Sequence, residues 1–125
     1  MALLVSVVDD DASVRQSLDR LIRSARLDVR VYASAEEFLQ SDAERKPDCL
    51  VLDVRLPGMS GPELHRHLMA QNYHVPTIFI TAHGSDDAAR SAADSDWTVA
   101  YLIKPFNGDE LLDAVDAALK WKKDG

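Results

Sequence analysis

Four short apolar segments of this sequence run into residues that could carry chemistry. The segments and the residues at their ends are 3–8 with Asp9, Asp10 and Asp11; 49–53 with Asp53; 77–81 with Thr81; and 99–103 with Lys104. Carboxylates brought together can bind a divalent cation, and a lysine and a hydroxyl beside them can hold an anionic group. Each residue alone is uninformative, since an aspartate at a strand end is usually a turn former or a helix cap. The recurrence at successive segments makes a shared site the better interpretation.

Whether these side chains meet depends on the elements that carry them. The expected strands are 3–8, 29–32, 49–53, 77–81 and 99–103; the expected helices are 11–25, a short helix after Ser34, one after Ser60, a weak one over 86–94 and a last one after Asn107. Strands and helices that alternate in this way predict an α/β fold with a parallel sheet and helices on both faces. Sites in such sheets form outside the carboxyl ends of the strands. We therefore expect the four segment ends to converge on one edge.

Three carboxylates at such an edge, Asp9, Asp10 and Asp53, would repel one another, and a cation among them would relieve the repulsion. Ligands that are all oxygen suit Mg²⁺. Lys104 and Thr81 would then complement an incoming phosphoryl group. Asp11 is best interpreted as the cap of the helix that follows it.

Composition limits the classes of function. A chain of 125 residues predicts a single domain over 1–125, and its net charge of −7 does not favour direct binding to nucleic acid or anionic membranes. The single cysteine excludes an intrachain disulfide. No apolar run approaches the length of about 20 residues needed to cross a bilayer, and the first residues lack the basic region of a signal peptide. We expect a cytoplasmic protein.

Four motifs together resemble the receiver domains of two-component response regulators over essentially the whole chain. They are VDDD at 8–11, DVRLPGMSG at 53–61, ITAH at 80–83 and KPF at 104–106. The residues of these motifs are most similar to those of receivers of the nitrogen-fixation-type transcriptional regulators. The resemblance implies a flavodoxin-like, doubly wound sheet of five parallel strands in the order 2-1-3-4-5, with helices on both faces.

By position, the resemblance assigns roles to the residues of the phosphorylation site. Asp53 corresponds to the phosphoacceptor, and Lys104 to the lysine that pairs with the phosphoryl group. Asp10 corresponds to a direct Mg²⁺ ligand and Asp9 to one that acts through water. The backbone carbonyl of Arg55 would supply a further metal ligand.

Other residues correspond to the switch and to its timing. Thr81 matches the hydroxyl that moves to bond the phosphoryl oxygen, and Tyr101 matches the aromatic residue that turns inward when it does. Arg55 and His83 occupy the positions that tune hydrolysis of the acyl phosphate. The Lys104–Pro105 peptide bond is expected to be cis.

The resemblance implies a signalling switch that takes a phosphoryl group from a histidine kinase or phosphotransfer protein onto Asp53 and regulates a partner or an effector domain. Such a module catalyses only its own phosphorylation and dephosphorylation. One alternative is a Mg²⁺-dependent aspartyl-phosphate phosphohydrolase, although Arg55 stands where those enzymes carry a second acid. Another is a flavin-binding carrier, whose phosphate the acids at 9–11 would repel. The sequence leaves open whether the chain is a free-standing regulator or part of a DNA-binding protein.

The sequence departs from the family before the last strand, where Asp96, Trp97 and Thr98 replace a small glycine-centred turn. Trp97 either packs on its neighbours, which is favoured because large aromatic residues are seldom exposed, or serves a partner surface. His65 and His67 are two residues apart on a predicted helix, so their spacing does not indicate a metal site.

Overall fold

The computed structural model describes residues 2–41, 46–82, 90–91 and 93–121. Its elements are β1 (Leu4–Val8), α1 (Ala12–Ser24), β2 (Asp28–Tyr32), α2 (Ala35–Gln40), β3 (Cys49–Asp53), α3 (Gly61–Ala70), β4 (Thr77–Thr81), β5 (Thr98–Ile103) and α5 (Gly108–Leu119). The helix expected over 86–94 lies mainly outside the described residues. Within that range, the described residues Arg90, Ser91 and Ala93 are helical.

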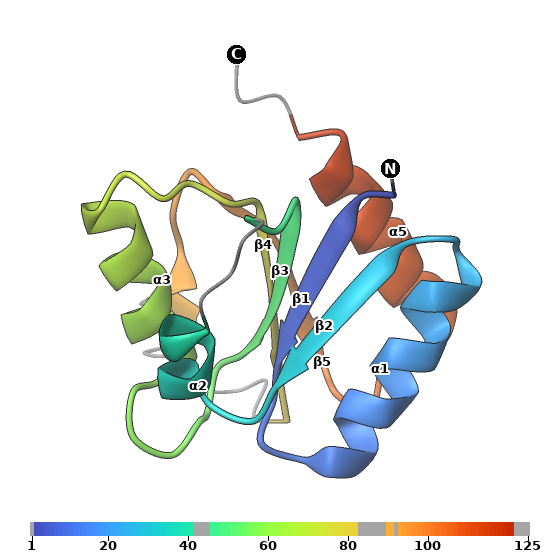
Figure 1. Cartoon of the computed structure of the whole chain (residues 1–125), viewed down its shortest axis with the longest axis horizontal. Helices are drawn as coiled ribbons and strands as arrows, with labels where there is room; N and C mark the ends of the chain where they lie inside the picture. Colours follow the sequence, from blue (N-terminus) through green and yellow to red (C-terminus); the bar gives the residue numbers. More distant parts are fainter. Residues whose placement is uncertain (1, 42–45, 83–89, 92, 122–125) are drawn as a thin grey trace.

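The sheet has five strands in the order β2-β1-β3-β4-β5, and every neighbouring pair is parallel. In Figure 1, α1 and α5 cover one face of the sheet, and α2 and α3 cover the other. The α/β class, the strand order and the two helical layers predicted from the sequence are confirmed.

The three central strands β1, β3 and β4 are buried along their whole length. Their nearly continuous apolar sequences suit strands covered on both faces. Successive side chains of β3 enter opposite cores: Cys49 and Val51 join the core under α1 and α5, and Leu50 and Leu52 join the core under α2 and α3. The edge strand β5 is only partly buried.

Polar caps begin the helices where the sequence predicts them. The Asp11 carboxylate accepts from the Ser13 backbone N–H at 2.8 Å, which starts α1 directly after the acidic segment. Ser60 and Asn107 form full capping boxes at α3 and α5. At α2 the box is incomplete, since Ser34 caps the Glu37 N–H but the Glu37 carboxylate accepts from Ala33 instead.

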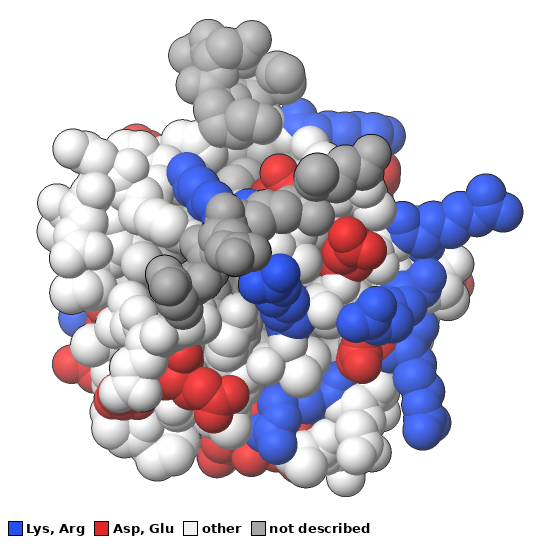
Figure 2. Space-filling model, in the orientation of Figure 1, with Lys and Arg blue, Asp and Glu red and all other residues white. Residues whose placement is uncertain are grey.

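The basic side chains are unevenly distributed although the net charge is −7. In Figure 2 they gather mainly on the side of the molecule formed by α1 and β2, where the chain carries arginines at 15, 20, 23, 26 and 30. Acidic side chains gather toward the lower edge of that view, the edge at which the strands end. Within the described residues, no helix combines the length and the apolar character that crossing a membrane requires.

The start of α3 is pressed against the end of β3. The Gly61 N–H donates to the Val54 carbonyl at 3.1 Å, and a Cβ on Gly61 would lie 2.2 Å from the backbone oxygen of Asp53. Only glycine allows this approach, so the position of α3 is set by the backbone of the residue that ends β3.

We expect Gly61→Ala to lower the free energy of unfolding by about 3 kcal/mol, because neither backbone segment can move away without displacing α3 from the sheet. Gly108→Ala is the matched control, since Gly108 also begins a helix and its Cβ would meet only the flexible tip of Leu21 at 3.2 Å. That change should alter stability by less than about 1 kcal/mol. Urea unfolding of both variants tests the expectation, and equal effects would contradict it.

Candidate functional site

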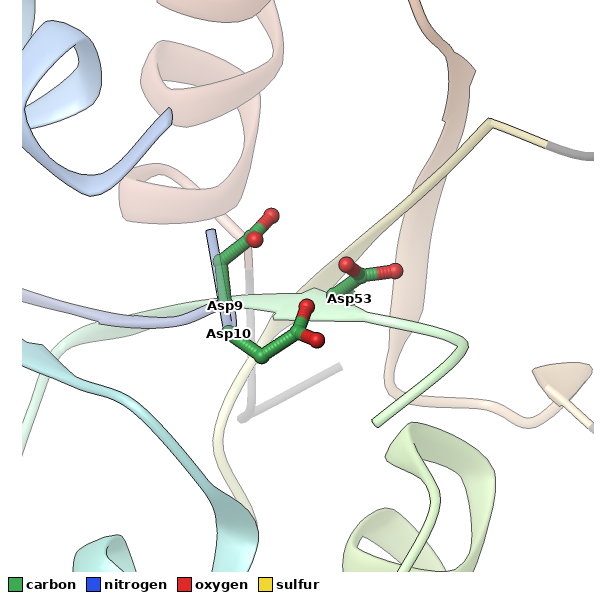
Figure 3. Close-up of side chains that lie close together, drawn as sticks. All are labelled: Asp9, Asp10 and Asp53. Carbon is green, nitrogen blue, oxygen red and sulfur yellow. The ribbon is translucent and has the colours of Figure 1, made fainter. Parts of the chain in front are cut away.

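The three predicted carboxylates meet at the carboxyl edge of the sheet. Asp53 is the last residue of β3, and Asp9 and Asp10 follow β1, the strand hydrogen-bonded beside it. One carboxylate oxygen from each lies within 4.8 Å of the others (Figure 3). Asp9 is 0% and Asp53 5% exposed, whereas Asp10 lies at the surface. The site is thus an acidic cluster that is open to solvent on the side of Asp10.

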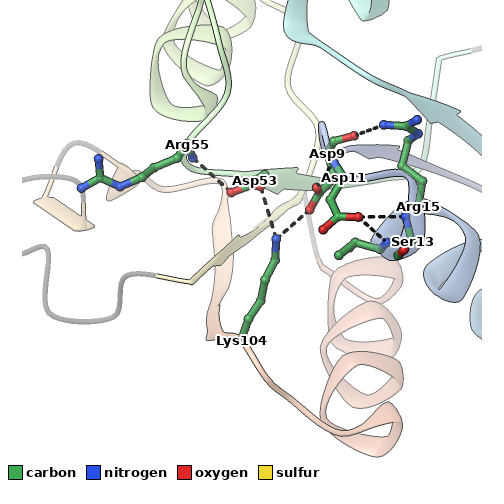
Figure 4. A network of polar contacts seen from close by, with 8 residues as sticks. Asp9, Asp11, Ser13, Arg15, Asp53, Arg55 and Lys104 are labelled. Atoms are coloured by element: carbon green, nitrogen blue, oxygen red, sulfur yellow. Dashed lines mark hydrogen bonds and ion pairs between the residues drawn. The ribbon is translucent and has the colours of Figure 1, made fainter.

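Lys104 is the cation of this cluster. Its Nζ lies 2.9 Å from Asp9 Oδ2 and 3.3 Å from Asp53 Oδ2, so one ammonium group bridges two buried carboxylates (Figure 4). The lysine follows β5, and its backbone N–H donates to the Thr81 carbonyl at 2.7 Å. The Lys104–Pro105 bond is cis, as predicted.

Further contacts fix Asp9 more firmly than its neighbours. The Asp9 Oδ1 atom accepts from the Asp11 N–H at 2.9 Å, while Oδ2 accepts from Lys104. The Asp9 carbonyl also accepts from Arg15 Nη1 at 2.7 Å. Within the described part of the chain, the Asp10 carboxylate accepts no hydrogen bond, so it is the carboxylate best able to turn toward a cation.

Burial and charge oppose each other at Asp53. Removal from water raises the pKa of the Asp53 carboxyl, and the Asp9 charge raises it further. Lys104 lowers it, and so does the Arg55 N–H, which donates to Asp53 Oδ1 at 3.1 Å. The resulting pKa is about 6. Burial lowers the pKa of Lys104, but the bond to Asp9 and the charges of Asp53 and Asp9 outweigh that effect and raise it. One ammonium therefore balances three carboxylates only in part, which favours an added cation.

The predicted switch residues lie on the two strands next to this cluster. Thr81 ends β4 and is 1% exposed. Tyr101 lies on β5 in register with Phe79, two residues before Thr81, and the Phe79 and Tyr101 ring centroids are 6.5 Å apart. The Arg90 guanidinium carbon lies 4.8 Å from the Tyr101 ring centroid. The remaining predicted residue, His83, lies outside the described residues.

The loop after Asp53 has an anchor that the sequence did not indicate. Gly58 has a φ of +76°, a conformation that favours glycine, and the following residue Met59 donates its N–H to Glu36 Oε2 of α2 at 2.9 Å. A Cβ on Gly58 would lie 2.7 Å from the same carboxylate oxygen. The contact joins residues 23 apart in sequence, so no local pattern could reveal it.

The unusual turn before β5 is packed rather than exposed. The Trp97 indole is half-buried and stacks on His74, with ring centroids 5.3 Å apart and planes 10° apart. The favoured of the two interpretations of Trp97 is therefore confirmed. His65, which the sequence analysis set aside, is buried and contacts Ser95 of the same turn. Its place beside the apolar positions Leu64 and Leu68 was the available signal.

Comparisons with known proteins identify a family that the chain matches. The family model described as the response regulator receiver domain matches residues 5–116. Nodulation protein W of Bradyrhizobium diazoefficiens is 50% identical over 115 residues, which are 92% of this chain and 50% of that protein. The chain spans about half the length of the first relatives it matches.

Solved structures show the same fold. The response regulator StyR superposes with a TM-score of 0.81 and 42% identity, over 96% of this chain and 60% of that one. The structure of FixJ-N superposes with a TM-score of 0.82 and 32% identity, over 98% of this chain and 97% of that one.

The raised pKa of Asp53 predicts a pH dependence of stability. The folded protein holds the Asp53 proton up to about pH 6, whereas the unfolded chain loses it near its ordinary value of 3.8. The folded state thus binds more protons between these values, so this group's contribution to stability is fully present below about pH 4 and is lost as the pH rises to about 6.

Asp53→Asn cannot titrate. In metal-free buffer we expect its free energy of unfolding, relative to the parent chain, to rise by about 2 kcal/mol between about pH 4 and pH 6.5 and to stay constant above. Urea unfolding across that range, with the exposed Asp113→Asn as control, measures the difference. A flat difference would show that Asp53 has an ordinary pKa.

Proposed function

The chain belongs to the response regulator receiver domain family, and on that premise we propose that Asp53 accepts a phosphoryl group from a histidine kinase or phosphotransfer protein. The chain is the phosphoacceptor switch module of a two-component system. The observation that carries the assignment of Asp53 is its position: it ends β3, lies within reach of both other acids, and contacts Lys104 at 3.3 Å, more loosely than the fully buried Asp9 does at 2.9 Å.

The transfer requires an in-line nucleophile and stabilisation of charge rather than proton chemistry. A carboxylate oxygen of Asp53 attacks the phosphorus of phosphohistidine, a P–O bond forms, and the P–N bond breaks with its electrons returning to the imidazole. Lys104, already 3.3 Å from Asp53 Oδ2, holds its ammonium where negative charge would gather on the phosphoryl oxygens. Asp9 keeps that ammonium in place.

The acidic cluster fits a divalent cation, because three oxygen ligands lie within 4.8 Å of one another with one ammonium to balance them. We assign Asp10, Asp53 and the Arg55 carbonyl as direct ligands of Mg²⁺ and Asp9 as a ligand through water. Asp9 suits the indirect role because its side chain is 0% exposed and is held more closely than that of Asp53, with hydrogen bonds of 2.9 Å from both the Asp11 N–H and Lys104. When bound, Mg²⁺ neutralises charge on the transferring phosphoryl group.

The signal would leave the site through Thr81 and Tyr101. The Thr81 hydroxyl would bond the phosphoryl oxygen, and Tyr101 would repack as β4 adjusts, a shift between two packings driven by the bonds that the phosphoryl group makes in only one of them. The side chains of Arg55 and His83 would tune how long the acyl phosphate survives.

The wider role follows from the family. We propose that residues 1–125 form one receiver domain, that it acts in the cytoplasm, that it catalyses only its own phosphorylation and dephosphorylation, and that its output is an effector domain or a separate partner protein. The E. coli relative NtrC, 38% identical over 93% of this chain, is a DNA-binding transcriptional regulator. This acidic domain would regulate such an output and not bind DNA itself. The phosphohydrolase alternative gains no support at position 55, where Arg55 faces Asp53 with its backbone N–H.

We expect acetyl phosphate with Mg²⁺ to add one phosphate to the parent chain and none to Asp53→Asn, because the variant lacks the nucleophilic oxygen. Asp11→Asn is the matched control: it removes a neighbouring acid, and asparagine caps a helix as well as aspartate does. Intact-mass measurement gives the result, and equal labelling of all three proteins would place the acceptor elsewhere.

Removing the exposed acid of the cluster should separate metal binding from folding. We expect Asp10→Asn to weaken Mg²⁺ binding by about tenfold or more, because it removes a charged ligand. Its metal-free stability should be unchanged or higher, since repulsion within the cluster falls. Calorimetric titration with Mg²⁺ and urea unfolding measure the two properties. Loss of stability with undiminished Mg²⁺ affinity would make Asp10 a structural residue instead.

A further inference from the structure

A buried histidine ties α3 to the turn that precedes β5. His65 is 3% exposed, and its Nε2 lies 2.6 Å from the hydroxyl oxygen of Ser95, 30 residues further along the chain. This contact joins the helix that begins at the end of the Asp53 strand to the segment that leads into the Tyr101 strand. It therefore ties the helix whose first residue packs against the Asp53 backbone to the turn before the switch strand.

The Ser95 hydroxyl organises the turn around itself. It accepts the Trp97 N–H at 3.1 Å and lies 3.3 Å from the Thr98 hydroxyl oxygen, which in turn donates to the Ala93 carbonyl at 2.5 Å. Since Thr98 uses its hydrogen on Ala93, the single hydrogen of Ser95 goes to either His65 or Thr98. In each arrangement the His65–Ser95 contact remains a hydrogen bond, and the position of Trp97 depends on it.

The contact between His65 and Ser95 does not require a positive charge on the imidazole. Burial lowers the pKa of His65, so the imidazole is neutral near pH 7 and acts through its hydrogen bond and its shape. Removing Ser95 would leave the buried imidazole without this bond. Removing His65 would take one partner from the Ser95 hydroxyl, which keeps its contacts with Trp97 and Thr98.

The ring of His65 also packs on Phe79, a neighbour of the switch residues. It meets Phe79 edge-on, with centroids 5.4 Å apart and planes at 76°, and Phe79 contacts Tyr101. Phe79 lies two residues before Thr81 on β4, so the two side chains share a face of the sheet. Any repacking of Thr81 and Tyr101 must accommodate Phe79 and hence His65.

We propose that His65 is a positioning residue of the switch: its bond to Ser95 and its ring against Phe79 hold the turn and Tyr101 in the present packing, and so set how readily phosphorylation at Asp53 changes it. The inference rests on the proposed function. An interaction present in one packing and weakened in the other shifts the balance between them, and the apparent affinity for a phosphoryl mimic shifts by the same factor.

The test compares three variants of α3 by their affinity for beryllofluoride in Mg²⁺. His65→Phe keeps a ring against Phe79 and loses the hydrogen bond, and it should bind beryllofluoride about fivefold more tightly, the factor that one buried hydrogen bond is worth. His65→Gln can place an amide near the Nε2 position and should stay close to the parent chain. His67→Phe, at an exposed position of the same helix, should bind like the parent chain.

A second route removes the other end of the contact. Ser95→Ala should tighten binding to a similar extent, and the double variant His65→Phe, Ser95→Ala should gain little more than either single change, because the two residues share one interaction. The single variant Ser95→Ala also tests the inference if His65→Phe fails to fold. Trp97 fluorescence should change in both single variants, since its backbone N–H donates to Ser95.

The outcomes distinguish failure of the proposed role of His65 from failure of the proposed function. A parent chain that does not bind beryllofluoride, or binds it equally after Asp53→Asn, refutes the proposed function. If the parent chain binds it and both His65→Phe and Ser95→Ala have lower thermal stability but unaltered or weaker binding, His65 serves packing alone and the inference is overturned.

Discussion

The bridge from Lys104 to Asp9 and Asp53 is the interaction on which the rest of the structure depends. Lys104 lies 95 residues after Asp9 and 51 residues after Asp53 in the sequence, so the bridge connects the last strand with the first and the third at one edge of the sheet. A buried carboxylate is costly unless it is paired, and here one ammonium stabilises two. The lysine reaches them from the position directly after β5, the strand that continues the sheet beside β4. The strand order and the acidic cluster are thus one arrangement, because the order of the strands brings the three residues to the same edge.

The elements around the site are held by backbone contacts that leave its side chains available. Asp11 caps α1, Gly61 lets α3 begin against the Asp53 carbonyl, and Glu36 anchors the loop after Asp53 at the Met59 N–H. None of these contacts uses the carboxylate of Asp10 or Asp53. The backbone can therefore stay fixed when the partners of these carboxylates change, which is the preorganisation that charge stabilisation requires.

The sequence predicted the sheet and the acidic cluster because both follow from local rules: buried strands are continuous apolar runs, and parallel strands end at one edge. Residue chemistry indicated that Lys104 and Thr81 could bind a phosphoryl group, and the switch roles of Thr81 and Tyr101 came from resemblance to a family. The geometry brings Lys104 to Asp53 and places Thr81 and Tyr101 on the strands beside the cluster without testing their roles. The Glu36 anchor and the His65–Ser95 bond were missed since each joins residues that are distant in sequence and individually ordinary. His65 in particular lies on a helix whose apolar pattern already accounts for its burial. Only its contact with Ser95 shows that the side chain makes a hydrogen bond and does not simply fill space in the core.

The pKa of Asp53 shows how burial and pairing are balanced for the proposed chemistry. With a pKa of about 6, the carboxylate is ionised at pH 7 in a ratio of about ten to one, and so it can act as a nucleophile without a base. Without Lys104 and the Arg55 N–H, burial and the Asp9 charge would push the pKa higher, and a larger share of the acid would be protonated at pH 7. Without burial the pKa would be near 3.8, and a less basic oxygen is a weaker nucleophile. The same lysine that stabilises the fold therefore keeps the acceptor ionised, and its second partner, Asp9, holds it in position when negative charge moves from the Asp53 oxygen to a phosphoryl group.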